Sequence, residues 1–429
     1  MKRWMIAPLL CVCLCAHVAG SEGAGGPLEK RFASLKETAH ALVAKRDAAL
    51  CAREFGLAVD GLVRDGTVAK LMAAPGGDPI RREGCCGGEM VVRLGGERET
   101  LRRTSYLARL QLYAIARRHG RQEAFEGLPM VVPAEDASAL RRVFGLLSAA
   151  RTPEERARAL DSLDPKYRKV MALVGADARW SAQDRRSWED CVREAQSLSA
   201  DAMQDASRTA VAAAEILIDL ARVGENEGLL GEALGRFKDA ANAVLPPGEV
   251  GWRILQTADA HRDADRFDLA MDIYALVEPG DAETPRPDWV AARLRTFSAM
   301  WSAAELQGER PADDQDIWAV LAGVAPRLRW HERIEEDFIA VMRRCRSRSA
   351  GGHEHLGIVD PILALLVCNA TSQDVRFQAA MSRGVFRERL GRRGDAAQTY
   401  RDSLQHITDP SLQRELRRQV KVAWSGVIR

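Results

Sequence analysis

The sequence predicts an all-α protein whose C-terminal half is an α-solenoid, an array of stacked antiparallel helix pairs. The composition favours helix over sheet, because alanine, leucine, arginine and glutamate are abundant and aromatic residues make up only 6% of the 429-residue chain. Short helices of similar character recur at intervals of about 40 residues, each preceded by a longer helix, as in helical repeat proteins. These short helices are expected to begin near Leu229, Arg266, Asp313, His355 and Asp395.

The first 20 residues predict a secretory signal peptide. Lys2 and Arg3 precede an apolar stretch of 13 residues, Trp4 to Ala16, which is too short for a typical membrane span. Small residues follow, so cleavage is expected after Gly20. We therefore expect export to the periplasm or the extracellular space.

Two alternatives to cleavage stay open for this N-terminal segment. One is an uncleaved membrane anchor, and the other is a lipoprotein carrying its lipid on Cys11, Cys13 or Cys15. The residues before these cysteines are leucine or valine, whereas lipidation signals have a small residue there. No later segment has 18 uncharged apolar residues, so the mature chain is expected to be soluble.

The mature chain is divided into three predicted parts. Residues 21–200 form a further helical region with a glycine-rich loop at 76–96, residues 201–410 form the repeats, and residues 411–429 form a capping helix. Within the first part, Thr152-Pro153-Glu154-Glu155 predicts a helix start, with threonine as the cap and proline at the first helical position. Asp164-Pro165 repeats this signal. The segments 90–94 and 128–132 are the only strand candidates, and both are short.

Residues 377–410 carry the most complete repeat pattern. Gly384 is a small residue in the first helix, and Ala396, Tyr400 and Ser403-Leu404 follow in the second, with Pro410 at the end. This order of small, aromatic and apolar positions resembles a tetratricopeptide repeat. The resemblance implies that Ala396 lets the paired helices approach closely and that Tyr400 fills the space beside the next unit.

Two further segments share this layout of alanine, an aromatic residue four positions later, and a small or apolar residue three beyond that. One contains Ala258 in its first helix and Ala270, Tyr274, Val277 and Pro279 in its second. The other contains Ala233, Phe237, Ala240 and Pro246. The units at 290–328 and 330–370 depart from the pattern, and His261 and Arg387 stand where the family has an aromatic residue.

The resemblance implies an exported, non-enzymatic scaffold that binds a peptide or a partner protein in a groove lined by the first helices of its repeats. The implied groove residues are Leu255, Asp259, Arg262, Met381, Val385 and Glu388. The same resemblance places Ala233, Phe237, Ala270, Tyr274, Gly384, Ala396 and Tyr400 at repeat-packing positions.

The sequence predicts no catalytic site, cofactor, metal or nucleic-acid partner. His331 and Glu335 have zinc-helix spacing, but a glutamate replaces the second histidine of that motif. The loop pair His353 and His355 lacks further ligands, and the adjacent Cys85 and Cys86 lie between glycines. A formal net charge of +2 gives no global attraction for nucleic acid.

An enzymatic alternative belongs to another class, a hydrolase or lyase of the cell envelope built on an (α/α) toroid. Its helix pairs also recur at about 40 to 50 residues, and its acidic and histidine residues would converge on one face. The residues to examine for that alternative are Asp259, His261, His331 and Glu335.

Overall fold

The structure is a computed structural model, and it describes residues 26–64, 111–126, 128, 146, 152–162, 165–173, 180–280, 285–307, 331–348 and 356–425. The predicted signal peptide, the glycine-rich loop, the strand candidate at 90–94 and the histidine pair at 353 and 355 lie outside these ranges. The described residues form helices, turns and one isolated bridge between Gly280 and Pro285, and they contain no strand. The predicted all-α class is confirmed for this part of the chain.

The chain separates into two compact units. The first comprises residues 1–245 with 263–266 and 306–309, and the second comprises 246–262, 267–305 and 310–429. Helix α8 (Ala182–Gln204) runs through residue 200, where the sequence predicts that the repeats begin. Leu198 and Ala202 are both fully buried, so the apolar face of this helix continues on either side of residue 200. The division falls between Leu245 and Pro246.

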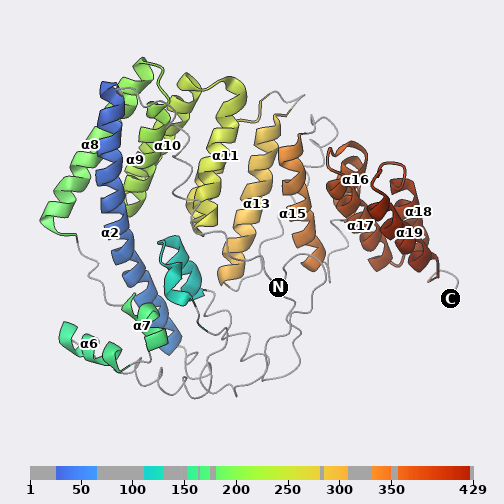
Figure 1. Ribbon diagram of the computed structural model, residues 1–429, viewed down its shortest axis with the longest axis horizontal. Coiled ribbons are helices and arrows are strands. Elements are labelled where there is room, and N and C mark those ends of the chain that lie inside the picture. The colour runs from blue at the N-terminus through green and yellow to red at the C-terminus, as the bar shows by residue number, and fades with distance from the viewer. Residues whose placement is uncertain are drawn as a thin grey trace. The chain divides into compact units, whose positions relative to one another are not determined.

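The first unit is built around α9 (Figure 1). Its named helices are α2 (Pro27–Arg64), η2 (Gln122–Phe125), α6 (Pro153–Asp161), α7 (Pro165–Ala172), α8, α9 (Thr209–Val223) and α10 (Glu227–Val244). Helix α9 packs against α2, α8 and α10. Since neighbours surround it, α9 is apolar around most of its circumference, and Leu217, Ile218 and Leu220 are fully buried.

A smaller core lies under the C-terminal half of α2. Phe55 packs there with Phe125 of η2, with Ala116 of the helical residues 111–118, and with Val170 of α7. The rings of Phe55 and Phe125 lie 6.2 Å apart between centroids. This core fixes the segment that carries His119 against α2.

The second unit consists of helices that pack largely on their neighbours in sequence. They are α11 (Pro247–Asp263), α12 (Phe267–Tyr274), α13 (Pro287–Gln307), α15 (Glu332–Arg348), α16 (Leu356–Asn369), α17 (Gln373–Arg389), α18 (Arg393–Ser403) and α19 (Pro410–Ser425). Helix α16 packs on α17, α17 on α18, and α18 on α19. Helices α11, α13 and α15 lie side by side (Figure 1).

The predicted helix starts agree with the structure wherever it describes them. Helices α10, α12, α16 and α18 begin within two residues of the positions expected for the short repeat helices. At the start of α6, the Glu155 amide donates to the Thr152 hydroxyl over 3.2 Å, and the Thr152 amide donates to the Glu155 carboxylate over 3.3 Å. This reciprocal pair is the predicted cap, with Pro153 at the first helical position.

Within the described part of the chain, no helix combines the length and the apolar character needed to cross a membrane.

Candidate functional site

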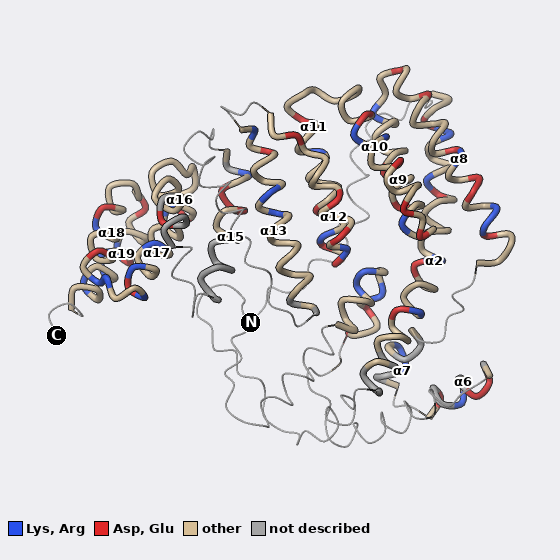
Figure 2. Tube along the Cα trace, turned by 180° about the vertical axis from the view of Figure 1, so that it is seen from behind, with Lys and Arg blue, Asp and Glu red and all other residues tan. Residues whose placement is uncertain are grey.

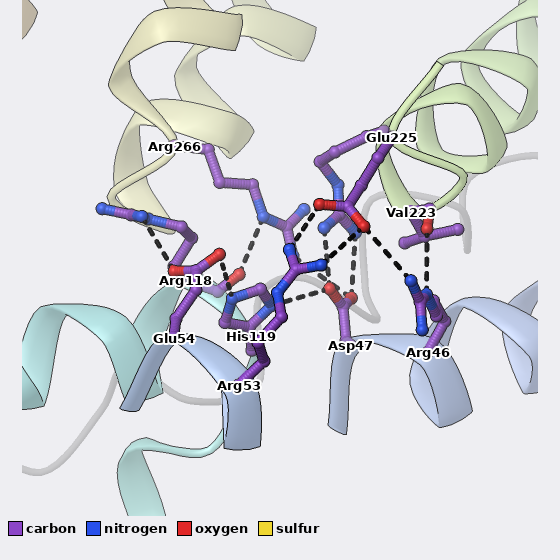
Figure 3. A network of polar contacts seen from close by, with 10 residues as sticks. Arg46, Asp47, Arg53, Glu54, Arg118, His119, Val223, Glu225 and Arg266 are labelled. Carbon is purple, nitrogen blue, oxygen red and sulfur yellow. Dashed lines mark hydrogen bonds and ion pairs between the residues drawn. The ribbon is translucent and has the colours of Figure 1, made fainter. Parts of the chain in front are cut away.

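A group of interacting charges in the first unit surrounds Asp47, a residue of α2 that is 6% exposed (Figure 3). Arg222 of α9 donates to both carboxylate oxygens of Asp47, over 2.7 and 2.9 Å. Arg266 adds a second cation at 3.6 Å. Burial alone would raise the pKa of Asp47, but hydrogen bonds from Arg222 and His119 outweigh it and hold that pKa well below its usual range.

His119 lies between two carboxylates. Its Nδ1 is 3.0 Å from Asp47 Oδ1, and its Nε2 is 3.2 Å from Glu54 Oε1. Burial opposes a charged imidazole, yet the two carboxylates prevail and raise the pKa of His119, while the pKa of Glu54 is lowered. The two carboxylates therefore favour the charged form of the ring.

Further arginines extend this cluster. Arg118 Nη1 lies 3.1 Å from Glu54, and Arg266 Nε donates to the Arg118 carbonyl over 2.8 Å. At the rim, Arg46 and Arg53 both pair with Glu225. The cluster thus joins α2, the end of α9, the segment around His119 and the segment at 263–266.

The chemistry of this cluster is that of a structural clamp. The His119 side chain is only 3% exposed, and both ring nitrogens face carboxylates, so neither is available to a substrate. Cys51 of α2 is also buried, and burial raises the pKa of its thiol to about 11, which keeps it protonated and unreactive. No group of three metal-binding side chains is found among the described residues.

A second chain of charges runs across α11, α13 and α15 of the second unit. Arg295 of α13 donates through Nε to Asp337 of α15 over 2.9 Å and pairs through Nη1 with Asp259 of α11 over 2.5 Å. All three side chains are 15–24% exposed, so they lie at the edge of the core. Burial raises the pKa of Asp337 to about 6, against the opposing attraction of Arg295.

Asp259 is the centre of this second cluster. It accepts a hydrogen bond from the Tyr274 hydroxyl over 2.5 Å and pairs with Arg262 over 3.0 Å. In the pair α17 and α18, the Tyr400 hydroxyl donates over 3.2 Å to Glu388, which precedes it by 12 residues, whereas Asp259 precedes Tyr274 by 15. In both pairs the tyrosine of the second helix therefore reaches a carboxylate on the first helix.

The residues that the resemblance assigns to a groove differ in exposure. Asp259, Arg262, Met381, Val385 and Glu388 are half-buried, so part of each side chain lies at the surface. Leu255 is fully buried and packs in the core of α11, which removes it from any exposed groove in this structure. The burial of Leu255 follows from helical geometry, because Leu255 shares the apolar stripe of Ala258 and Ile254 rather than the polar side of α11.

The residues assigned to repeat packing are all buried. Phe237, Tyr274 and Tyr400 are exposed by 1% or less, and the alanines at 233, 270 and 396 are fully buried. Gly384 lies directly against Tyr400, because a Cβ at this glycine would stand 2.1 Å from the tyrosine Cε1. The first helix of this pair therefore needs glycine at that point.

The four residues of the enzymatic alternative do not converge. Asp259 belongs to the charge chain described above, and His261 is buried in α11. His331 lies beside Trp252, with 5.4 Å between ring centroids. Glu335 is 1% exposed and accepts from the backbone amides of Thr371 and Ser372 over 2.7 and 3.4 Å. That contact satisfies the start of α17, a structural role.

Several residues of these clusters escaped the sequence reasoning, above all Asp47, His119, Arg222, Arg295 and Asp337. A signal for two of them is present in the sequence. Asp47 lies one helical turn from the buried Leu50 and Cys51, and Asp337 lies one turn from the buried Ile334 and Val341. A carboxylate within an apolar stripe indicates a buried partner of opposite charge.

No family model, no curated protein and no solved structure matches this chain.

Proposed function

We propose that the chain is an exported, non-enzymatic scaffold that binds a peptide or partner protein through helix pairs similar to tetratricopeptide repeats. The observation that carries the proposal is the agreement of two helix pairs, α11–α12 and α17–α18. In each, a buried alanine precedes a buried tyrosine by four residues, and the tyrosine hydroxyl donates to a carboxylate of the first helix. Such agreement supports a repeated unit rather than two unrelated hairpins.

The binding surface in this proposal is the polar side of the first helices. Arg262 and Asp259 on α11 and Met381 and Val385 on α17 are partly exposed, so they offer both charge and apolar area to a partner. First helices of successive pairs in such arrays line a continuous surface suited to an extended or helical peptide. The structural role of the clusters around Asp47 and Glu335 also favours binding over catalysis.

Peptide selection on the mature chain tests this proposal. Peptides recovered from a random display library would be measured by calorimetry against wild type, Arg262→Ser and Met381→Ser. The control is Asp268→Ser, which removes an exposed charge from α12, the second helix of the same pair as α11. We expect losses of tenfold or more for the first two variants and wild-type affinity for the control. Failure to recover any peptide, or equal affinity for all four proteins, would contradict the proposal.

The proposal includes export with loss of residues 1–20. N-terminal sequencing of the protein purified from its own host should find Ser21 first. An intact Met1 in the cytosolic fraction would overturn the proposed export. The proposed binding surface would still be tested separately by the peptide experiment.

A further inference from the structure

Helix α19 packs on the second unit by one face only. It contacts α18 and α17. Leu416 is fully buried and Ala423 is 3% exposed, and these two residues lie on one side of the helix because they are seven positions apart.

The opposite face of α19 is basic. Arg414, Arg417, Arg418 and Lys421 are all exposed, and their spacing of three, four and seven residues places them on one side of the helix. Basic positions recur on the last helices of this unit (Figure 2). Glu415 is the single acidic residue of α19, and it pairs with Arg418.

The other three cations have no ion-pair partner among the described side chains. Arg417 donates to the uncharged Gln413 over 3.2 Å. The pKa of Asp409 is lowered mainly by a hydrogen bond from Ser411, and Arg414 contributes only a weaker attraction. A helix at the end of a stacked array needs a polar outer face for solubility, but that need is met equally by mixed charges. Solubility therefore does not explain why the charges on this face of α19 are nearly all positive.

Two apolar residues accompany the cations. Val422 is 53% exposed beside Arg418 on the helix surface. Trp424 is half-buried, and the Arg401 guanidinium lies 5.7 Å from its ring centroid. Arginine and lysine on an exposed helix face with tryptophan at its border are typical of helices at the boundary of a lipid bilayer.

We propose that the outer face of α19, formed by Arg414, Arg417, Arg418, Lys421 and Val422, binds an anionic lipid surface. Charge complementarity carries the choice of occupant, because cations near an anionic leaflet each add to the attraction. The cations lie on one side of a single helix, which suits contact with a flat lipid surface. A peptide-binding groove would need side chains on both sides of the peptide. This surface is separate from the proposed groove, since none of its residues lies on α11 or α17.

Vesicle co-sedimentation of the full mature chain tests the proposal. The probes are vesicles of phosphatidylcholine alone and vesicles containing added phosphatidylglycerol, at low ionic strength so that screening does not mask the attraction. We expect binding to the anionic vesicles only. The triple variant Arg414→Gln, Arg417→Gln, Lys421→Gln should bind on the order of 100-fold more weakly, since each of the three cations contributes roughly a fivefold factor.

The matched control removes the same amount of charge elsewhere. Arg185, Arg186 and Arg193 are exposed on α8, and their joint replacement by glutamine should leave vesicle binding close to wild type. Circular dichroism melting of both triple variants verifies that they stay folded. The proposal is overturned if wild type binds both vesicle types equally, or if both triple variants lose binding to the same extent. Binding to soluble polyglutamate without binding to anionic vesicles would also overturn it, and would indicate an acidic protein partner.

Discussion

Gly384→Ala should destabilise the last helix pair although it adds only one methyl group. The ideal Cβ at this position would lie 2.1 Å from Tyr400 Cε1, 2.2 Å from Cζ and 2.6 Å from the hydroxyl oxygen. Carbon atoms in ordinary contact are at least 3.4 Å apart, so the Tyr400 ring or α17 would have to move by about 1.3 Å to accommodate the new methyl group. Tyr400 is fully buried and its hydroxyl is tied to Glu388, so it has little freedom to move.

The expected cost is the balance of three effects. Overpacking of a buried site costs about 1–3 kcal/mol, and loss of the hydrogen bond between Tyr400 and Glu388 adds about 1 kcal/mol. Alanine in a helix gains roughly 0.5–1 kcal/mol over glycine, which offsets part of this. We expect a net loss of about 1–3 kcal/mol in the free energy of unfolding.

A double-mutant cycle with Tyr400→Leu isolates the contact. Urea unfolding would be measured for wild type, both single variants and the double variant, with hydrogen exchange at the amides of α17 and α18 as a local readout. Leucine lacks the ring atoms that meet the new methyl, so Gly384→Ala should be neutral or mildly stabilising in that background. Gly394→Ala in α18 is the control, because no atom lies within 4 Å of its added Cβ. Equal destabilisation by Gly384→Ala in both backgrounds would refute the steric explanation.

Three further predictions concern the buried charges. Asp47→Asn should lower the free energy of unfolding by about 3–5 kcal/mol in urea titrations, since Arg222 loses its nearest charged partner, whereas Arg31→Ala in an exposed pair should cost less than about 1 kcal/mol. Because the pKa of His119 is raised, its contribution to stability is fully present below pH 6.5 and disappears as pH rises through the higher folded value. Wild-type stability should therefore fall as pH rises above 6.5, and His119→Gln should flatten that fall. If His119→Gln leaves the pH dependence unchanged, the two carboxylates do not favour the charged form of the ring. The pKa of Asp337 is also raised, to about 6 from an ordinary 3.8, so stability should again fall as pH rises, here by up to about 3 kcal/mol between pH 4 and pH 6. Asp337→Asn should remove this dependence in pH-resolved urea titrations. A variant with the wild-type pH profile would contradict the assignment.

The local features of the fold could be predicted from sequence, because they depend on residues close together in the chain. The cap at Thr152 requires only Glu155, three residues away, and the start of α12 requires only a change in apolar spacing next to Arg266. The domain boundary could not be predicted in this way. It depends on which neighbours bury α8, and the predicted change near residue 200 reflected where recognisable repeats begin.

Most partners within the charge clusters could not be predicted from the sequence, because they are far apart along the chain. Asp47 and Arg222 are separated by 175 residues, and no rule of helical spacing connects them. Asp259 was singled out as a surface residue through the family resemblance, but its partners Arg295 and Asp337 come from the following helices. The family resemblance assigned Leu255 to the groove, whereas the apolar stripe of α11 predicts that it is buried.

The packing of α2 on α9 affects the order in which the chain can fold. In the second unit, α16 to α19 each meet a neighbour soon after synthesis, whereas α2 must wait for α9, whose Arg222 follows Asp47 by 175 residues. At translation rates of about 5–20 residues per second, that interval lasts roughly 10–35 s. The apolar residues Leu35, Ala39 and Leu50, which are buried in the folded unit, stay uncovered until the helices that pack on α2 have been made. Helix α2 therefore depends on a holding chaperone for longer than α16 to α19 do, and loop closure over this distance should make the first unit the slower to fold.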